Sequence, residues 1–253
     1  MVDIHSHILY GIDDGAHTIE ESLAMLELAA ESGITDIVAT PHSDLRFRFQ
    51  PEVMAAQIAE LQSHLGDRIR IHRGCDFHLH FDNIRTCLTD TARFTINGKR
   101  YLMVEFADQT IPKTIADVFE DMIARDITPV ITHPERNKLL MGRIDDMAKW
   151  IRLGCLVQVT GASFLGRFGK NAEQGAGKLM ARNMVHFVAS DAHDTQHRPP
   201  DLREPYKHVV SEYGQEIATR LFQTNPAATL TGAEVEYEDP EGGEEKKPRW
   251  KFW

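Results

Sequence analysis

The chain has 253 residues, of which 42% are apolar, and a formal net charge of −10. This size and apolar content predict one large domain with a continuous core, and the acidic balance excludes the basic face that nucleic-acid binding requires. The three cysteines have no metal-binding or redox spacing, so we expect reduced thiols and a cytoplasmic protein. We expect neither a signal peptide nor a transmembrane segment, because no apolar run has the required length and flanks.

The predicted strands are seven short runs rich in β-branched residues. In chain order they cover residues 2–7, 35–42, 69–76, 100–105, 128–133, 156–160 and 186–191. All but one of these runs end in a histidine or a carboxylate. Polar residues at the ends of otherwise buried strands predict a functional site along one edge of the sheet.

Helix patterns separate most of the predicted strands. Thr18 and Glu21 form a capping box at the start of an amphipathic run that ends at Gly33. Further helices are predicted at residues 51–66, 113–125, 145–153 and 172–182, with two more after residue 203. This alternation, with a period of about 30 residues, is typical of βα units with parallel strands. The pair Asn97-Gly98 predicts one hairpin turn and thus a local antiparallel pair of strands.

The positions of the strand ends favour a barrel over an open sheet. A barrel of βα units collects functional residues from several strand ends on its carboxyl face, whereas an open doubly wound sheet gathers ligands at one switch point. We therefore predict an α/β fold, namely a distorted TIM-like (β/α)7 barrel with its active site at the C-terminal ends of the strands.

The C-terminal tail differs in composition from the rest of the chain. Residues 1–233 are expected to form the barrel domain, and residues 234–253 a charged, disordered tail that is broken by Gly and Pro. The tip at residues 249–253 alternates aromatic and cationic side chains. Trp is favoured at lipid headgroups, so we predict that this tip docks on a partner protein or peripherally on a membrane.

Nine candidate metal ligands lie at or near the strand ends. His5 and His7 are two residues apart, so in a strand both side chains point to the same side and reach one cation. Nitrogen and oxygen donors without thiolate suit Mn, Fe or Zn. Because nine donors exceed the need of one ion, we predict two or three divalent ions, an arrangement that hydrolyses phosphate esters. The nine candidates are His5, His7, Asp14, His42, Asp76, Glu105, His133, Asp191 and His193.

Two arginines follow these ligands closely in the sequence. Arg136 comes just after His133, and Arg198 lies in the loop after His193. The planar guanidinium group matches the oxygens of a phosphoryl group, so we predict that both arginines are catalytic. Cys87 and Arg93 have the Cys-x5-Arg spacing of cysteine-based tyrosine phosphatases, but the glycines that wrap a phosphate are absent between them. We interpret that spacing as coincidental.

These motifs together resemble the polymerase and histidinol phosphatase (PHP) superfamily. Within it, they are similar to the bacterial manganese-dependent tyrosine phosphatases of capsule and exopolysaccharide operons. The resemblance extends from residue 1 to about residue 230. It is carried by His5-x-His7, Gly11-Ile-Asp-Asp-Gly-Ala16, Thr40-Pro-His42, Val104-Glu105, His133-Pro-Glu-Arg136 and Ala189-Ser-Asp-Ala-His193.

The resemblance implies a three-metal centre that dephosphorylates the tyrosine-rich tail of a partner bacterial tyrosine kinase, with Mn as the metal. The family usually has a glutamate that bridges two of the ions, but this chain has the shorter Asp76 at that position. The arginines of the family match Arg136 and Arg198. By position, one ion takes His5, His7 and Asp191, a second takes Glu105 and His133, and a third takes Asp14, His42 and His193.

Two alternative functions remain open from the sequence. A small-molecule phosphomonoesterase, such as a histidinol phosphatase, would use the same metals in a more enclosed pocket. A non-catalytic regulator would bind the kinase without hydrolysing phosphate, if Asp76 cannot support a competent metal cluster.

Overall fold

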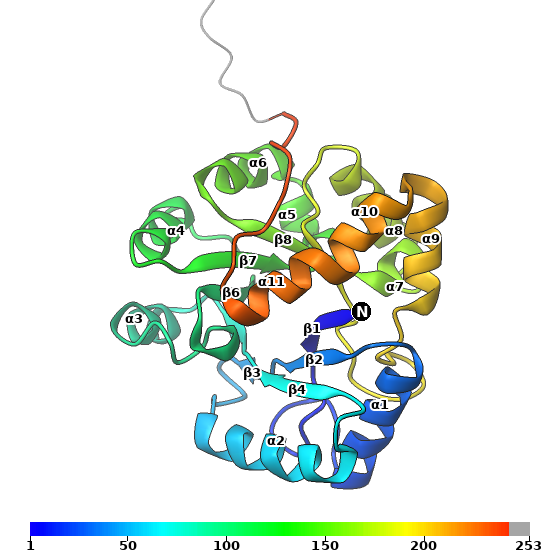
Figure 1. Cartoon of the computed structure of the whole chain (residues 1–253). Helices are drawn as coiled ribbons and strands as arrows, with labels where there is room; N and C mark the ends of the chain where they lie inside the picture. The colour runs from blue at the N-terminus through cyan, green and yellow to red at the C-terminus, as the bar shows by residue number, and fades with distance from the viewer. Residues whose placement is uncertain (243–253) are drawn as a thin grey trace, which may run out of the picture.

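Parallel strands form the centre of the molecule and helices surround them (Figure 1). The computed structural model describes residues 1–242. The strands in these residues are β1 (Val2–Ser6), β2 (Asp36–Ala39), β3 (His42–Ser43), β4 (Arg70–Arg73), β5 (Asp76–His78), β6 (Tyr101–Glu105), β7 (Thr128–Thr132), β8 (Leu156–Thr160) and β9 (Phe187–Ala189).

The strands form two parallel sheets with the orders β1-β2-β4 and β3-β5-β6-β7-β8-β9. Two predicted strands, 35–42 and 69–76, are each divided between the sheets, at Pro41 and at Gly74-Cys75. Proline cannot donate to the ladder, and a Cβ on Gly74 would lie 2.7 Å from the Val38 side chain, so the chain changes direction at both points. A single bridge, between Ser6 and Ala192, links β1 to the end of β9. The predicted α/β class with parallel strands is confirmed.

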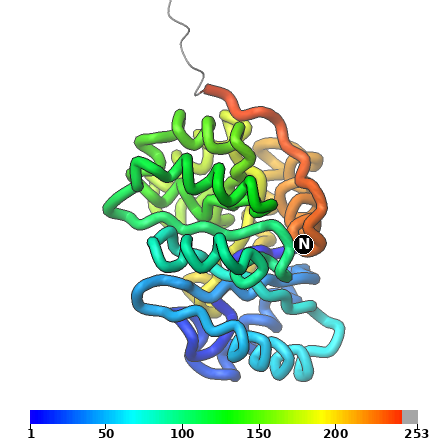
Figure 2. The backbone as a smooth tube through the Cα atoms, turned by 90° about the vertical axis from the view of Figure 1, so that its left-hand side faces the viewer, coloured from blue at the N-terminus to red at the C-terminus, as the bar shows by residue number. Residues whose placement is uncertain are grey.

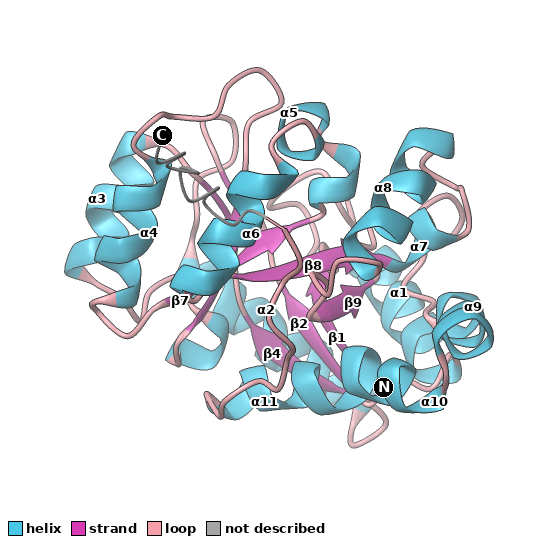
Figure 3. Cartoon of the chain, turned by 90° about the horizontal axis from the view of Figure 1, so that it is seen from above, coloured by secondary structure: helices cyan, strands magenta, loops and turns pink. Residues whose placement is uncertain are grey.

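The helices pack around the outside of the strands, as the view from above shows (Figure 3). The predicted N-cap is confirmed, because the Thr18 side chain accepts a hydrogen bond from the Glu21 amide at the start of α1 (Ile19–Glu31). The reciprocal half of the capping box is displaced by one residue, since the Glu21 side chain accepts from the His17 amide. The helices that follow, up to residue 180, are α2 (Pro51–Leu65), α3 (Phe81–Thr89), α4 (Ile115–Ile123), α5 (Lys138–Met141), α6 (Ile144–Leu153), α7 (Gly161–Phe164) and α8 (Lys170–Met180).

The predicted hairpin at Asn97-Gly98 is wrong. These residues belong to a short 3-10 helix, η1 (Ile96–Gly98), and β6 pairs in parallel with both β5 and β7. Phe94, which precedes the turn, does not form the antiparallel strand pair that the hairpin requires. Its ring packs against the rings of Phe49 and Phe77, with centroid distances of 5.1 and 5.0 Å. Aromatic packing in the core thus replaces the antiparallel ladder.

The inner face of the strands changes from apolar to polar along its length. Residues two apart in a strand share a face, so Glu105 lies on the face of Met103, and Thr132 on the face of Val130. The amino-terminal part of this face forms a buried apolar cluster, and a larger cluster fills the space between strands and helices. The inner cluster contains Val2, Ile4, Val38, Ile96, Tyr101, Met103, Val130, Leu156, Phe187 and Ala189.

The C-terminal helices close the amino ends of the strands. Leu230 and Val235 pack against the inner cluster, and the Asn225 side chain donates to the His186 carbonyl at 3.0 Å. In Figure 1 this segment crosses the near face beside the N-terminus. It consists of α9 (Arg203–Tyr213), α10 (Gln215–Thr219), the π-helix η3 (Arg220–Thr224) and α11 (Asn225–Thr231). None of the helices in the described residues is long and apolar enough to cross a bilayer.

The predicted tail packs on the body over its first nine residues, 234–242. Its backbone follows the outside of the helices in Figure 2. Arg152 donates to the Pro240 carbonyl at 2.7 Å, and the Nε of Arg182 donates to the Glu241 carbonyl at 2.9 Å. The expectation of an unpacked tail from Glu234 is therefore wrong for residues 234–242, because arginines of the body satisfy its carbonyl groups. The predicted aromatic tip at 249–253 lies outside the described residues.

Two glycines of α8 offer a matched test of the packing. A Cβ on Gly175 would lie 3.0 Å from the Glu135 carbonyl oxygen, whereas a Cβ on Gly177 would have no neighbour within 4 Å. We expect Gly177→Ala to raise the free energy of unfolding by up to about 1 kcal/mol through helix propensity. We expect Gly175→Ala to be about 1–3 kcal/mol less stable than Gly177→Ala, because the backbone at Glu135 must move. Urea unfolding of both variants measures the difference, and equal stabilities would contradict it.

Candidate metal centre

The structure brings the nine predicted metal ligands together at the carboxyl ends of the strands. Among the described residues, three groups have ligand atoms within 4.8 Å of one another, namely His7-Asp14-His42-His193, His5-His7-Asp76 and His42-Asp76-Glu105. The other two candidates adjoin these groups. Asp191 Oδ1 lies 3.5 Å from Nε2 of His5 and 3.5 Å from Nε2 of His7, and His133 Nε2 lies 3.7 Å from Glu105 Oε1.

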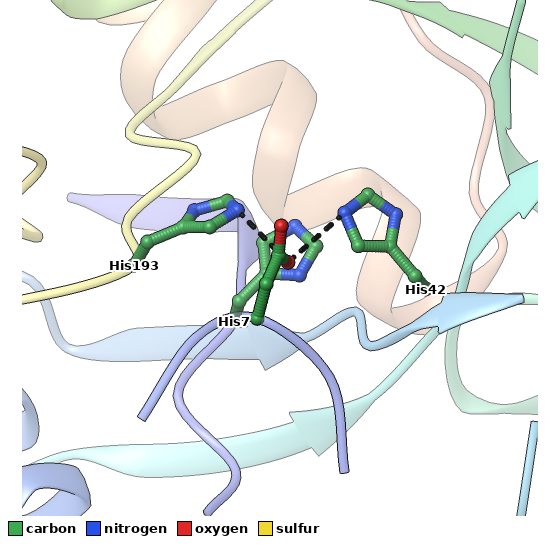
Figure 4. A group of neighbouring side chains, drawn as sticks. His7, His42 and His193 are labelled. Atoms are coloured by element: carbon green, nitrogen blue, oxygen red, sulfur yellow. Dashed lines mark ion pairs between the residues drawn. The ribbon is translucent and has the colours of Figure 1, made fainter. Parts of the chain in front are cut away.

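Asp14 lies between His42 and His193. Its Oδ1 is 3.4 Å from His42 Nε2 and 3.5 Å from His193 Nε2, and dashed lines in Figure 4 mark these ion pairs beside His7. The loop after β1 folds tightly enough to hold Asp14 there only because residue 15 is glycine, where a Cβ would lie 2.0 Å from the His7 carbonyl oxygen. Three segments that are far apart in sequence thus contribute to one cluster, namely the loop after β1, strand β3 and the loop after β9.

His5 and His7 present unsubstituted ring nitrogens to the same point. The Nδ1 of His7 lies 2.7 Å from Asp13 Oδ2, and the Nδ1 of His5 lies 2.9 Å from Gln158 Oε1. Because these oxygens accept hydrogen bonds, each ring donates from Nδ1, so Nε2 is the unprotonated nitrogen whenever the ring is neutral. The two Nε2 atoms are 3.4 Å apart. Two facing lone pairs at this distance repel each other unless a proton or a metal cation lies between them.

The sequence analysis missed Asp13 and Gln158. Asp13 is buried and also accepts from the amide groups of Gly15 and His42, at 3.0 and 3.1 Å, so it fixes both the loop and the ring of His7. Its position beside Asp14 in one motif is a sequence signal that could have found it. Gln158 had no such signal, because its role depends on the inward face of β8.

Asp76 carries the strongest sign of a missing positive partner. It is fully buried, and neither carboxylate oxygen accepts a hydrogen bond from the described residues. His42 Nδ1 approaches Asp76 Oδ2 to 3.2 Å and His5 Nε2 approaches it to 3.5 Å. Burial raises the pKa of Asp76, but the charges of His5 and His42 outweigh burial and lower it well below its ordinary value. A buried carboxylate without hydrogen bonds is costly unless it is paired or coordinates a metal.

The surrounding pKa shifts also reflect an excess of carboxylates. Burial and the charge of Asp76 raise the pKa of Glu105 to about 8. Burial would lower the pKa of His42, but the carboxylates of Asp14 and Asp76 outweigh it and raise the value to about 11. The proton on His42 thus offsets the negative charge of these carboxylates, as a metal cation would. The donor set, its burial and its charge therefore fit divalent metal ions.

Arg136 and Arg198 converge on the other oxygen of Asp191. Both guanidinium groups donate to Asp191 Oδ2, at 2.5 and 2.6 Å. The ring of Phe168 lies against both, with its centroid 4.6 Å from the Cζ of Arg136 and 5.7 Å from the Cζ of Arg198. Cation–π contacts of this kind hold guanidinium groups in place. Phe168, from the loop before α8, was not predicted from the sequence.

Two of the candidate ligands have unusual backbone conformations. His133 and Asp191 have φ values of 36° and 53°, in the left-handed region that favours glycine. Such conformations cost about 1–3 kcal/mol and persist where surrounding structure enforces them, often at functional sites. In both cases the turn directs a side chain from just beyond a strand end into the cluster.

The cluster forms the floor of an open pocket of about 570 Å³. Arg46 and Asp108 are exposed at its mouth, and both predicted arginines line its wall. His78 also lines the pocket, although it belongs to none of the three donor groups. A volume of this size is sufficient for an aryl phosphate.

Cys87 lies away from this pocket. Its side chain is fully buried in α3, and burial raises its pKa to about 12. A cysteine nucleophile needs a lowered pKa and access to substrate. The interpretation of the Cys87-x5-Arg93 spacing as coincidental therefore agrees with the structure.

Comparisons with known proteins agree with this architecture. Residues 1–231 match the protein family described as "Capsular polysaccharide synthesis, CpsB/CapC". The chain belongs to this family. The family recognised from the sequence motifs is thereby confirmed.

Relatives in the family carry phosphatase names. The tyrosine-protein phosphatase CpsB of Streptococcus pneumoniae is 32% identical, with 89% of this chain and 96% of that protein covered. The tyrosine-protein phosphatase YwqE of Bacillus subtilis is 30% identical, with 88% and 89% covered. A crystal structure from the description "Crystal structures of YwqE from Bacillus subtilis and CpsB from Streptococcus pneumoniae, unique metal-dependent tyrosine phosphatases" matches this chain with a TM-score of 0.90. The sequence identity is 28%, and the match covers 96% of this chain and 99% of that chain.

The fold is shared more widely. The lactonase Lmo2620 from Listeria monocytogenes has a TM-score of 0.58 at 14% identity, with 92% of this chain and 95% of that chain covered. An α/β fold of parallel strands with functional residues at the strand ends therefore does not by itself determine the reaction.

The burial of Cys87 and the metal-type donor set lead to one joint prediction. We expect Cys87→Ala to retain turnover of p-nitrophenyl phosphate, because the thiol does not reach the pocket. We expect treatment with EDTA to abolish that turnover and added Mn to restore it, because the donor cluster then regains its cations. Loss of turnover in Cys87→Ala, with no effect of EDTA on the wild-type protein, would instead indicate catalysis by the cysteine and not by metal ions.

Proposed function

We propose that this protein is a metal-dependent phosphatase that hydrolyses phosphotyrosine on a protein partner. The observation that carries the proposal is the buried, unsatisfied carboxylate of Asp76 at the centre of nine convergent donors. Two arginines line the same open pocket. Membership of the CpsB/CapC family and the phosphatase names of the relatives support this reaction over the others that the fold accommodates.

The metal content we propose is two or three divalent ions, with Mn as the metal. We assign one ion to His5 and His7 with Asp191, a second to Glu105 and His133, and a third to Asp14 with His42 and His193. The shared position of Asp76 in two of the donor groups supports a bridging role for it. Nitrogen and oxygen donors without thiolate suit Mn, and also accept Fe or Zn.

Ions held by these donors lower the pKa of water toward 7 and offset the charge of the phosphate. The side chains of the protein bind and orient the phosphoryl group. Arg136 and Arg198 present two guanidinium groups to one point, a geometry that suits the non-bridging oxygens of a phosphoryl group. The hydroxyl of the departing tyrosine has a pKa of about 10, so its release depends less on a general acid than release of an alkyl alcohol does.

The partner we propose is the tyrosine-rich tail of a bacterial tyrosine kinase that controls capsule or exopolysaccharide synthesis. The open mouth of the pocket and the family description support this choice. We also propose a cytoplasmic location, since the three cysteines are free and buried in the described residues.

The substrate class can be tested with two phosphate esters. We expect the metal-loaded protein to hydrolyse a phosphotyrosine peptide with a kcat/KM at least about tenfold higher than that for histidinol phosphate, because the open pocket receives an aryl phosphate on a chain. Steady-state kinetics with both substrates, with and without added Mn, measure the ratio. A preference for histidinol phosphate would favour a small-molecule phosphatase, and absence of turnover in both assays would favour a kinase-binding regulator.

A substitution at Arg136 tests the predicted catalytic role of the arginines that line the pocket. We expect Arg136→Ala to lower kcat by about 10²–10³-fold with unchanged metal content, because one donor to the phosphoryl oxygens is lost. We expect Arg136→Lys to restore little of the loss, since an ammonium group cannot reproduce the planar fork. Kinetics together with elemental analysis separate catalysis from metal binding, and unchanged turnover in Arg136→Ala would remove this residue from the mechanism.

A further inference from the structure

A second groove opens beside the metal pocket, and Arg136 lines both. This groove, which we call the lysine groove, lies between η2 (Pro134–Arg136), α5 and α8. Its volume is about 490 Å³, and Phe168 and Met141 give it apolar walls. A chain whose phosphotyrosine is held at Arg136 therefore passes next to the lysine groove.

The lysine groove carries positive charge that is not compensated locally. Lys138 and Lys178 line it from opposite elements, and both are exposed. In residues 1–242, the lysines that form ion pairs with carboxylates are Lys149 and Lys207. The ammonium groups of Lys138 and Lys178 thus remain available for an incoming anion.

The wall on α8 is polar along a single face. Asn171, Gln174 and Lys178 recur at a spacing of three and four residues, which places them on one side of the helix. Gly175 on the same side allows the helix to approach η2 closely, since a Cβ there would lie 3.0 Å from the Glu135 carbonyl oxygen. Two amide side chains and one ammonium group therefore face the groove.

Among the described residues that line the groove, Glu135 is the one carboxylate, and it forms no ion pair with Lys138 or Lys178. Its side chain is almost fully buried, and Oε1 accepts hydrogen bonds from the Ser163 hydroxyl and the Thr160 amide, at 2.7 and 3.1 Å. The lining of the metal pocket, by contrast, includes Asp44 and Asp108 together with Arg46.

We propose that the lysine groove binds an anionic side chain that neighbours the phosphotyrosine in the substrate. This inference rests on the proposed function and specifies its substrate class. The anion is either a carboxylate of Glu or Asp or the phosphoryl group of a second phosphotyrosine, because both offer charged oxygen acceptors to ammonium groups. Charge complementarity of this kind selects the substrate and its orientation across the site.

The experiment compares three phosphotyrosine peptides that differ only in the residues beside the phosphotyrosine. One has alanines, one has glutamates, and one has a second phosphotyrosine. For each peptide, kcat/KM is divided by the value for p-nitrophenyl phosphate, which is too small to reach the groove. The proteins are the wild type, the double variant Lys138→Glu/Lys178→Glu, and the control Lys99→Glu. Lys99 is exposed just before β6, at the end of the strand opposite to Glu105, so its reversal makes the same kind of charge change far from the groove.

We expect the wild type to favour an anionic peptide over the alanine peptide by roughly twofold to fivefold, the upper part of the range for exposed ion pairs. The preference is expected to disappear in the double variant, to persist in Lys99→Glu, and to decline with added salt. A preference limited to the glutamate peptide or to the doubly phosphorylated peptide identifies the source of the anion.

Two results would overturn the inference while leaving the proposed function intact. One is equal relative kcat/KM for all three peptides in the wild type. The other is an anionic preference that the double variant retains. A wild-type protein that does not hydrolyse p-nitrophenyl phosphate or any peptide in the presence of Mn would instead refute the proposed function itself.

Discussion

The central constraint on this structure is the electrostatic imbalance at the carboxyl ends of the strands. Four carboxylates meet there, and both oxygens of the fully buried Asp76 lack hydrogen bonds within the described residues. Burial of charge without compensation destabilises a fold. Arg136 and Arg198 compensate one oxygen of Asp191, and histidines approach the other carboxylates. The remaining imbalance is what divalent cations would correct, and the positions of the surrounding loops follow from it.

Much of this could be predicted from the sequence, because the strands repeat a simple pattern. Buried parallel strands are short apolar runs, and the residue that ends each run lies at the same edge. His5, His42 and His133 could therefore be assigned to one site from their positions along the chain alone. Chain order and residue type carry this information directly, since neighbouring strands in a βα fold lie side by side.

Other features depend on tertiary contacts that no local pattern encodes. The division of the sheet follows from Pro41 and from the close approach of Gly74 to Val38, which only the packed strands reveal. Gln158 orients His5 across 153 residues of sequence, and Phe168 lies against two arginines from different loops. The packing of residues 234–242 likewise depends on arginines of distant helices, so the composition of the tail was misleading there.

The left-handed backbone at His133 and Asp191 places the conformational stability of the fold in conflict with metal binding at the site. Glycine would adopt these conformations without strain, so at His133 the fold would tolerate the residue that removes the ligand, whereas at Asp191 the same change would also leave Arg136 and Arg198 without their carboxylate partner. Variants selected only for thermal resistance would therefore drift away from the chemistry of the site. Engineering of this protein for robustness should leave both positions fixed and seek its improvements at the amino ends of the strands.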